Sequence, residues 1–274
     1  MQPLQTGVCT WSLAIPDLAT TLATVKNELG LSLVHLGFMD DGYKDRDKTL
    51  ETIKASGLEI SATCVAFAGE DYSSIQQIAE TGGFKPDHDW DSRLAKTVAV
   101  ADITKELGVK MLAAHIGFVP HDKNDPKHAV MVDRTKLICD ELGQRGVTLV
   151  METGQEKAED LVEFIAAVGR DNIGVNFDPA NMILYGVGNP IEAIEVLKEK
   201  IVHVHMKDAT WSAKPGQEWG AEVVLGTGEA DIPQVVSKLR AVGYQGALSI
   251  EREAGDQRIA DIKEAISLLT SLKG

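Results

Sequence analysis

The chain has 274 residues, of which 44% are hydrophobic and 25% are charged, as is usual for a globular protein. Its formal net charge of −14 disfavours nucleic acid and anionic membrane surfaces as partners, because both would repel it. No apolar run approaches the roughly 18 residues of a membrane-spanning helix, and no basic segment followed by an apolar one suggests a secretory signal.

The cysteines give a second indication of where the protein works. The chain has three cysteines, which are Cys9, Cys64 and Cys139. Their odd number, and the absence of a spacing typical of a metal site, predict reduced thiols and no disulfide framework. We therefore expect a cytoplasmic protein.

Strand-like and helix-like segments alternate from one end of the chain to the other. The expected strands are 7–11, 33–36, 58–65, 109–116, 147–152, 173–178, 201–206 and 247–251. The expected helices lie near 18–29, 47–56, 91–107, 126–142, 157–168, 190–200, 233–242 and 256–272. Eight such units predict a (β/α)₈ TIM barrel, formed as a single domain over residues 1–274. A doubly wound open sheet is the alternative.

The last four strands decide between these folds. Side chains on a strand alternate between faces, and here one face is wholly apolar. It holds Val147, Leu149, Met151, Ile173, Val175, Phe177, Val202, Val204, Met206, Leu248 and Ile250. The other face carries Thr148, Glu152, Asn176, Asp178, His203, His205, Ser249 and Glu251. A doubly wound sheet would need apolar residues on both faces, so the polar face favours the barrel.

Four ionisable residues stand at the C-terminal ends of these strands, where TIM barrels place their chemistry. They are Glu152, Asp178, His205 and Glu251. Three carboxylates and one imidazole form a hard, oxygen-rich set, which suits one divalent metal ion: Mn²⁺, Mg²⁺ or Co²⁺, with Zn²⁺ possible. The alternative is that each acid caps a helix or pairs with a lysine.

Other residues could line the same pocket. His115 ends the fourth strand, Trp11 ends the first, and Lys207 continues the polar face beyond His205. Lys207 could bind a substrate oxygen or act as an acid or base; the alternative is an ion pair with Asp208 or a nearby glutamate.

Two further features lie near this end of the seventh strand. His203, two residues deeper than His205, is expected to be a hydrogen-bonded core residue and not a ligand. The connection 208–231 is long and rich in glycine, and it could act as a lid.

Several motifs together resemble the xylose-isomerase-like sugar phosphate isomerase/epimerase superfamily, across nearly the whole chain. They are Met151-Glu152, Phe177-Asp178-Pro179-Ala180-Asn181, Val202-His203-Val204-His205-Met206-Lys207-Asp208, Gly226-Thr227-Gly228-Glu229-Ala230-Asp231-Ile232 and Gly243-Tyr244-Gln245-Gly246 leading into Ser249-Ile250-Glu251. The resemblance implies a TIM barrel, the metal ligands Glu152, Asp178, His205 and Glu251, and a homo-oligomer. It also implies that Glu152 and Glu251 are catalytic and move protons on opposite faces of the substrate.

The chain departs from that pattern at three places. Asn181 stands where many epimerases carry a histidine, and the second strand lacks a terminal glutamate. Cys64 stands where the endonuclease branch has a histidine, which argues against DNA repair.

These features predict a metal-dependent isomerase or epimerase that acts on a keto sugar or keto-cyclitol through an enediolate. The candidate substrate-binding residues are His115, Asn181, Lys207 and Trp11. The alternative is a lyase or dehydratase on the same platform, which acts on an inosose or a 3-keto-glycoside. A third possibility is a non-catalytic binding protein. The nearby cations are few, so we expect a non-phosphorylated carbohydrate.

Overall fold

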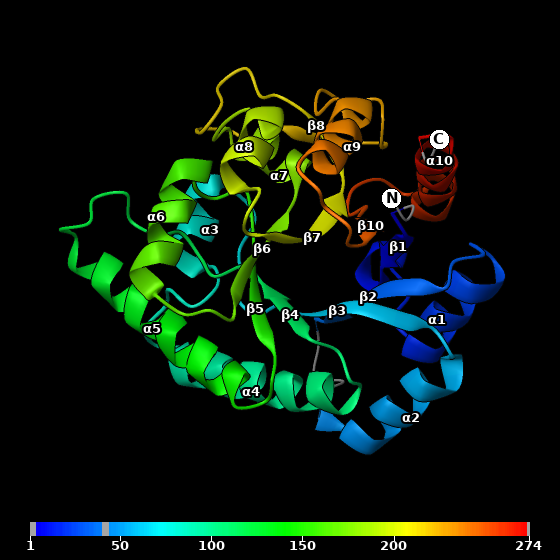
Figure 1. The fold of residues 1–274 in the computed structure, drawn as a ribbon, viewed down its shortest axis with the longest axis horizontal. Coiled ribbons are helices and arrows are strands. Elements are labelled where there is room, and N and C mark those ends of the chain that lie inside the picture. Colours follow the sequence, from blue (N-terminus) through cyan, green and yellow to red (C-terminus); the bar gives the residue numbers. More distant parts are fainter. Residues whose placement is uncertain (1–3, 40–43, 273–274) are drawn as a thin grey trace.

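The computed structural model describes residues 4–39 and 44–272. Within them, eight parallel strands form a closed barrel in the order β1-β10-β7-β6-β5-β4-β3-β2 (Figure 1). The strands are β1 (Thr6–Cys9), β2 (Leu33–Phe38), β3 (Glu59–Val65), β4 (Met111–Ala114), β5 (Thr148–Glu152), β6 (Ile173–Phe177), β7 (Ile201–Met206) and β10 (Leu248–Ile250). The predicted single-domain (β/α)₈ barrel is confirmed, and the open sheet is wrong.

Helices surround the barrel (Figure 1). They are α1 (Leu18–Asn27), α2 (Arg46–Ser56), α3 (Ile75–Thr81), α4 (Trp90–Glu106), α5 (Pro126–Gly143), α6 (Ala158–Val168), α7 (Pro179–Leu184), α8 (Pro190–Leu197), α9 (Ile232–Ala241) and α10 (Arg258–Ser271). Their first residues follow from capping. Asp17, Asp125 and Asn189 accept backbone N–H bonds at the starts of α1, α5 and α8, and a proline follows at the first position of α5 and α8.

The two faces of the strands pack as their alternation predicts, except that Val202, which was expected on the apolar face, is 38% exposed. Met151, Val175 and Val204 are fully buried in a core that also contains Leu161 of α6 and Ile194 of α8. Burial of this outer face against the helices supplies most of the hydrophobic stabilisation. The barrel interior holds a smaller apolar cluster of buried residues, which consists of Cys64, Ala113 and Val150.

Four elements differ from the sequence-based expectation. The expected strand 7–11 ends at Cys9, and Trp11 lies in a 3₁₀ helix, η1 (Thr10–Leu13). The connection after β3 contains α3, and the turn after β6 is the short helix α7. The connection 208–231 begins with an antiparallel hairpin of β8 (Asp208–Thr210) and β9 (Ala221–Val223). Such short elements have too few residues to show a period.

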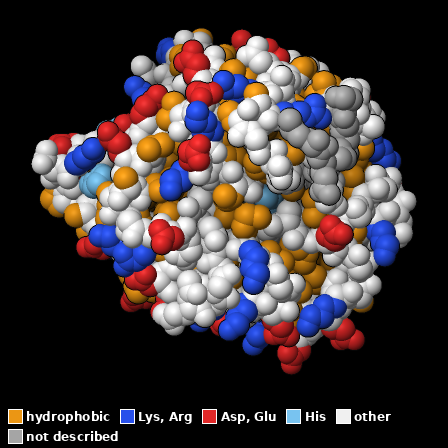
Figure 2. Space-filling view, viewed as in Figure 1, with side chains coloured by type: hydrophobic (Ala, Val, Ile, Leu, Met, Phe, Trp, Pro, Cys, Tyr) orange, Lys and Arg blue, Asp and Glu red, His pale blue; other side chains and the backbone are white. Residues whose placement is uncertain are grey.

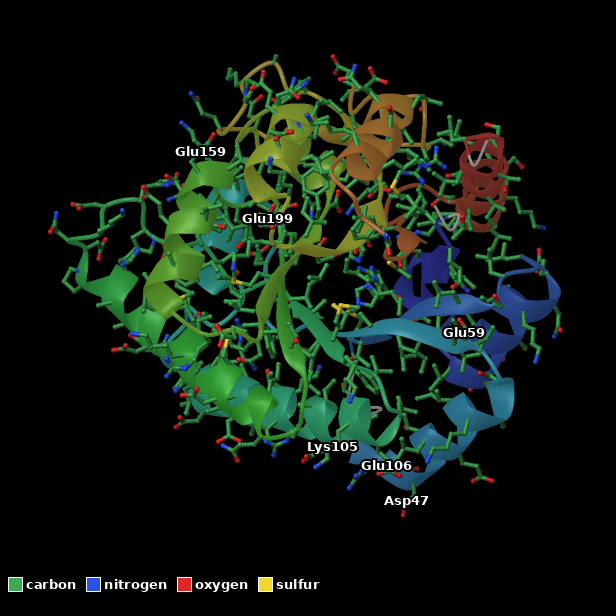
Figure 3. All side chains as sticks on the ribbon, in the orientation of Figure 1. Asp47, Glu59, Lys105, Glu106, Glu159 and Glu199 are labelled. Carbon is green, nitrogen blue, oxygen red and sulfur yellow. The ribbon has the colours of Figure 1, made fainter. Side chains whose placement is uncertain are left out.

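The outer surface carries both signs of charge. Acidic and basic side chains are interspersed on the face shown in Figure 2. Asp47, Lys105 and Glu106 project from the outer helices in Figure 3, and Glu106 accepts a hydrogen bond from Arg46 across α4 and α2. No described helix is both long and apolar enough to cross a membrane.

Candidate metal centre and active site

The four predicted ligands come together at one end of the barrel. Glu152 ends β5, Asp178 follows β6, His205 lies in β7 and Glu251 follows β10. One ligand atom from each lies within 4.8 Å of the others, and all four residues are buried. His205 Nδ1 lies 3.1 Å from Glu152 Oε1, 3.4 Å from Glu251 Oε2 and 3.9 Å from Asp178 Oδ2. The side chains therefore converge on a common point.

Asp178 shows that this cluster fits a cation. Its Oδ1 accepts the backbone N–H groups of Ala180 and Asn181 at the start of α7, at 2.8 and 3.1 Å. Its Oδ2 is buried and has no hydrogen-bond partner. A buried carboxylate oxygen without a partner is costly, and a metal ion would satisfy it. Three carboxylates and one imidazole suit Mn²⁺, Mg²⁺ or Co²⁺.

Glu251 is held by two side chains that the sequence pointed to as substrate contacts. Trp11 Nε1–H donates to its Oε1 at 2.8 Å, and Lys207 Nζ donates to its Oε2 at 3.0 Å. The ring of Trp11 packs over β2 at Gly37, where a Cβ atom would lie 2.5 Å from the ring. Trp11 thus lines the pocket while its indole N–H orients Glu251.

Lys207 is only 4% exposed and is surrounded by acids. Besides Glu251, its Nζ lies 2.7 Å from Glu253 and 3.8 Å from Glu222. The expected pairing with Asp208 is wrong, because the Asp208 carboxylate accepts backbone N–H bonds instead, among them those of Gly226 and Gly228. The pairing with nearby glutamates is confirmed.

Glu152 is oriented by residues from β4 and α7. Its Oε1 accepts a hydrogen bond from Asn181 Nδ2 at 3.0 Å, and His115 Nε2 lies 3.4 Å from its Oε2. His115 Nδ1 is buried without a partner. Asn181 and His115 therefore contact a predicted catalytic carboxylate directly, and both also line the pocket.

Burial and neighbouring charges shift the pKa values of the three carboxyl groups in different directions. Burial raises the pKa of Asp178 well above its usual range. Burial also opposes the charge of Glu251, but Lys207 and His205 outweigh it and hold the pKa of Glu251 well below its usual range. The same balance lowers the pKa of Glu152, where His115 and His205 act. Two of the acids thus favour the ionised form that a base or ligand requires.

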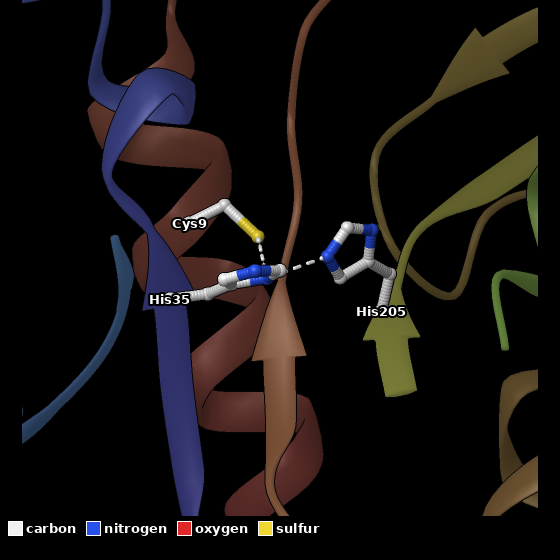
Figure 4. Close-up of side chains that lie close together, drawn as sticks. All are labelled: Cys9, His35 and His205. Carbon is white, nitrogen blue, oxygen red and sulfur yellow. Dashed lines mark hydrogen bonds between the residues drawn. The ribbon is translucent and has the colours of Figure 1, made fainter. Parts of the chain in front are cut away.

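A network of buried polar residues lies beneath the four ligands, and it includes His35 and Asn176, which the sequence reading did not single out. His205 Nε2 lies 2.9 Å from His35 Nδ1 (Figure 4). It also lies 3.1 Å from the Asn176 side-chain nitrogen. His203 contacts the Asn176 oxygen at 2.8 Å and is a hydrogen-bonded core residue, as predicted. Period-two alternation on β2 could have placed His35 on this inner face.

Cys9 completes a second group with His35 and His205 (Figure 4). Its Sγ lies 3.9 Å from His35 Nδ1. Burial raises the pKa of the Cys9 thiol to about 12, so the thiolate that a metal would require is disfavoured. All three cysteines of the chain are free and buried.

Above the four ligands lies a pocket of about 690 Å³. Its aromatic lining residues are Trp11, Phe67, Tyr72, Tyr185 and Trp219. Lys207 is the one lysine or arginine among the described residues that line it. Aromatic walls and acids, without a free cation, are suited to a neutral polar molecule.

The β8–β9 hairpin forms part of the pocket wall and contributes Trp219, Gly220 and Glu222. Glu222 Oε1 accepts hydrogen bonds from Arg252 Nη1 and from the backbone N–H groups of Glu253 and Ala254, at 2.7, 2.9 and 3.2 Å. The hairpin is therefore fastened to the loop between β10 and α10. A lid function of this segment stays a prediction.

Comparison with solved structures places this barrel among similar ones. A xylose isomerase domain protein from Planctomyces limnophilus is 33% identical, with a TM-score of 0.88 over 100% of this chain and 98% of the other. A xylose isomerase-like TIM barrel protein from Mycobacterium smegmatis, in complex with magnesium, is 18% identical, with a TM-score of 0.71 over 99% and 98%. An L-ribulose 3-epimerase is also 18% identical, with a TM-score of 0.74 over 98% and 94%. At 18% identity the likeness shows the fold alone.

Curated relatives match only a part of the chain. An uncharacterized protein from Methanocaldococcus jannaschii is 31% identical over 98 residues, and an inosose dehydratase from Clostridium botulinum is 27% identical over 114. The matches cover 35% and 38% of this chain, and 31% and 38% of those relatives. The family model for the xylose isomerase-like TIM barrel, in contrast, matches residues 26–272. The chain therefore belongs to the xylose isomerase-like TIM barrel family.

Proposed function

We propose that this protein is a metal-dependent isomerase or epimerase of a keto sugar or keto-cyclitol. The observation that carries the proposal is the convergence of Glu152, Asp178, His205 and Glu251 below the pocket, with Asp178 Oδ2 lacking a hydrogen-bond partner. These four residues would hold one divalent cation. When bound, such a cation supplies Lewis-acid polarisation of a substrate carbonyl.

The two glutamates would carry the proton transfers. One carboxylate takes the proton from the carbon next to the carbonyl, which leaves an enediolate. The other, which also favours the ionised form, must first take up a proton before it delivers one to the opposite face for epimerisation, or to the neighbouring carbon for isomerisation. Glu152 ends β5 and Glu251 follows β10, and an oxygen of each lies 3.1 and 3.4 Å from His205 Nδ1. Their approach to opposite faces of the substrate is part of this proposal.

The lining of the pocket supports a neutral substrate. Lys207 donates hydrogen bonds to Glu251 and Glu253, so its positive charge is already paired and is not available to bind a phosphate. Trp11 and Trp219 offer flat apolar surfaces for the C–H faces of a sugar ring, and His115 Nδ1 is an unused polar atom at the wall. The proposed partner is therefore a non-phosphorylated carbohydrate.

A lyase is the second candidate, and His115 is the observation that favours it. This side chain lies beside Glu152 with Nδ1 unpartnered, and it could protonate a departing β-hydroxyl or glycosyl oxygen of the same enediolate. Lys207 is less suited to that role, because Glu251 and Glu253, against the effect of burial, raise its pKa well above the usual range.

Proton NMR in deuterated water tests both candidates. The Mn²⁺-loaded protein is incubated with a panel of ketoses, inososes and 3-keto-glucosides, and Mn²⁺ is removed before spectra are recorded. An epimerase or isomerase incorporates deuterium without loss of any group from the substrate, whereas a lyase expels a group and yields an enone. Glu152→Gln and Glu251→Gln should each lower the rate by about 10²–10⁴-fold. Undiminished exchange in both variants would contradict the assigned roles.

A further inference from the structure

His205 presents two different nitrogens to two different surroundings. Its Nδ1 faces Glu152, Glu251 and Asp178, and its Nε2 faces His35 and Asn176. An imidazole nitrogen binds a metal only when it carries no proton. Ligation through Nδ1 therefore requires that the proton of the neutral ring stays on Nε2.

His35 has a hydrogen-bonding pattern that can enforce this. Its Nε2 lies 3.2 Å from the carbonyl oxygen of Thr63, which can only accept, so Nε2 carries the proton of the ring. His35 is completely buried, and an imidazole that carries its one proton on Nε2 keeps a lone pair on Nδ1. Its Nδ1 is therefore an acceptor, and the atom 2.9 Å away is His205 Nε2.

The geometry points to His35 as the positioning residue that keeps the proton of His205 on Nε2 and so turns the Nδ1 lone pair toward the divalent cation. This inference rests on the proposed function, because the cation is the one proposed there. The order of donation runs from His205 Nε2–H to His35 Nδ1, and from His35 Nε2–H to the Thr63 carbonyl. A ligand on β7 is thus oriented by a residue on β2, across the interior of the barrel.

The side chain of Asn176 lies between His205 and His203. Its nitrogen faces His205 Nε2 at 3.1 Å and its oxygen faces His203 Nδ1 at 2.8 Å. The proposed order of donation requires this amide to be turned over, which exchanges two atoms of nearly the same shape and lets the oxygen accept from His205 Nε2–H. The nitrogen then donates to His203 Nδ1, and His203 Nε2–H donates to Ser61 Oγ, 3.0 Å away. The Ser61 hydroxyl in turn donates to the Val34 carbonyl at 3.2 Å.

The rival use of this cluster is a cation held by Cys9, His35 and His205 Nε2. Such a site would need a free lone pair on His205 Nε2. In the proposed order of donation this nitrogen carries a proton, which it donates to His35 Nδ1. It would also need a thiolate at a fully buried sulfur. The two uses of His205 exclude each other as long as its ring stays neutral.

A matched pair of substitutions separates an orienting role from a merely structural one. Leu and Asn have the same branched outline, but only Asn keeps an oxygen acceptor near the place of His35 Nδ1. Mn²⁺ is titrated into chelator-treated protein, and free Mn²⁺ is followed by electron paramagnetic resonance. His35→Leu should weaken Mn²⁺ binding by about 10–100-fold, and His35→Asn should restore most of that loss. Equal affinity of His35→Leu and wild type, or equal loss in both variants, would overturn the inference.

A second measurement uses the wild-type protein, so its main result does not depend on whether a variant folds. Protein labelled with ¹⁵N-histidine and loaded with Zn²⁺, which is diamagnetic, is expected to show His35 and His205 both protonated on Nε2. A proton on Nδ1 of His35 would overturn the inference, as would a sulfur-to-cobalt charge-transfer band in the Co²⁺-loaded protein that Cys9→Ala removes. Wild type that binds no Mn²⁺ at all would instead overturn the proposed metal site.

Discussion

The indole Nε1–H of Trp11 donates a 2.8 Å hydrogen bond to Oε1 of Glu251, and it joins the segment after β1 to the segment after β10. Trp11→Phe keeps an aromatic ring against the pocket but removes this donor. We expect Mn²⁺ affinity to fall about tenfold, because partners of metal ligands tune ligand orientation. Isothermal titration calorimetry measures the change, and Trp90→Phe, at the start of α4, is the control that should leave it unaltered. An unchanged affinity in Trp11→Phe would mean that Glu251 needs no such support.

Metal binding should stabilise the fold. The carboxylates of Glu152, Asp178 and Glu251 are buried within a few ångströms of one another, so a cation relieves their mutual repulsion. At a free Mn²⁺ concentration 100 times the dissociation constant, we expect about 2.7 kcal/mol of added stability. Thermal denaturation with and without a chelator measures this. The same comparison in Asp178→Asn should show a smaller difference.

Asp208 should be essential for the segment that follows β7. Its carboxylate accepts the backbone N–H groups of Gly226 and Gly228 on one oxygen and those of Ala209 and Ala230 on the other. Asp208→Asn places an N–H₂ group against two N–H donors, and we expect a loss of about 3 kcal/mol in the free energy of unfolding.

The control for this substitution lies in the same segment. Asp231 caps α9 by accepting from the Gln234 N–H, and Asn caps a helix about as well as Asp. Urea denaturation should therefore show a large loss in the free energy of unfolding for Asp208→Asn. The loss for Asp231→Asn should be negligible. A small effect of Asp208→Asn would show that water can replace the carboxylate.

Glu156 predicts a dependence of stability on pH that is separate from the metal centre. Burial raises its pKa from 4.5 to about 8, and the single N–H bond from Val119 opposes this only in part. Between these values the folded chain keeps a proton that the unfolded chain has lost. This contribution to stability is therefore fully present below pH 4.5 and is lost as the pH rises toward 8, by up to about 1.4 kcal/mol per pH unit.

Glu156→Gln keeps an oxygen for the Val119 N–H and removes the titration. The variant should unfold at higher urea concentration than wild type at pH 8, while the two should differ little near pH 4.5. If the free energies of unfolding of Glu156→Gln and wild type changed equally with pH over this range, the raised pKa of Glu156 would be contradicted. Both proteins are compared in the metal-free state.

The period-two alternation of the last four strands contained most of what was needed to predict the fold and the ligand cluster. In a closed parallel barrel one strand face must point inward and the strand ends must lie together, so Glu152 and His205 could be placed near each other without coordinates. The positions of Asp178 and Glu251 follow from the same rule, since each comes directly after its strand.

The support around those ligands could not be predicted in the same way. Trp11 depends on where β1 ends, and a 3₁₀ helix of four residues has no sequence period to show it. The contact between His35 and His205 joins residues 170 positions apart, and it depends on the register of β2 across the barrel. The lengths and angles of such contacts are set by packing of the whole barrel, which a single sequence does not contain.

The imidazoles of His35, His203 and His205 occupy the part of the barrel where aliphatic side chains would ordinarily fill the space. The residues that orient the proposed metal centre are therefore also part of the barrel interior, and neither can be exchanged alone. Transplanting only Glu152, Asp178, His205 and Glu251 into a foreign barrel would deliver a histidine free to rotate or to expose the wrong nitrogen. To rebuild this centre in another protein, β2, β6 and β7 would have to be transferred together.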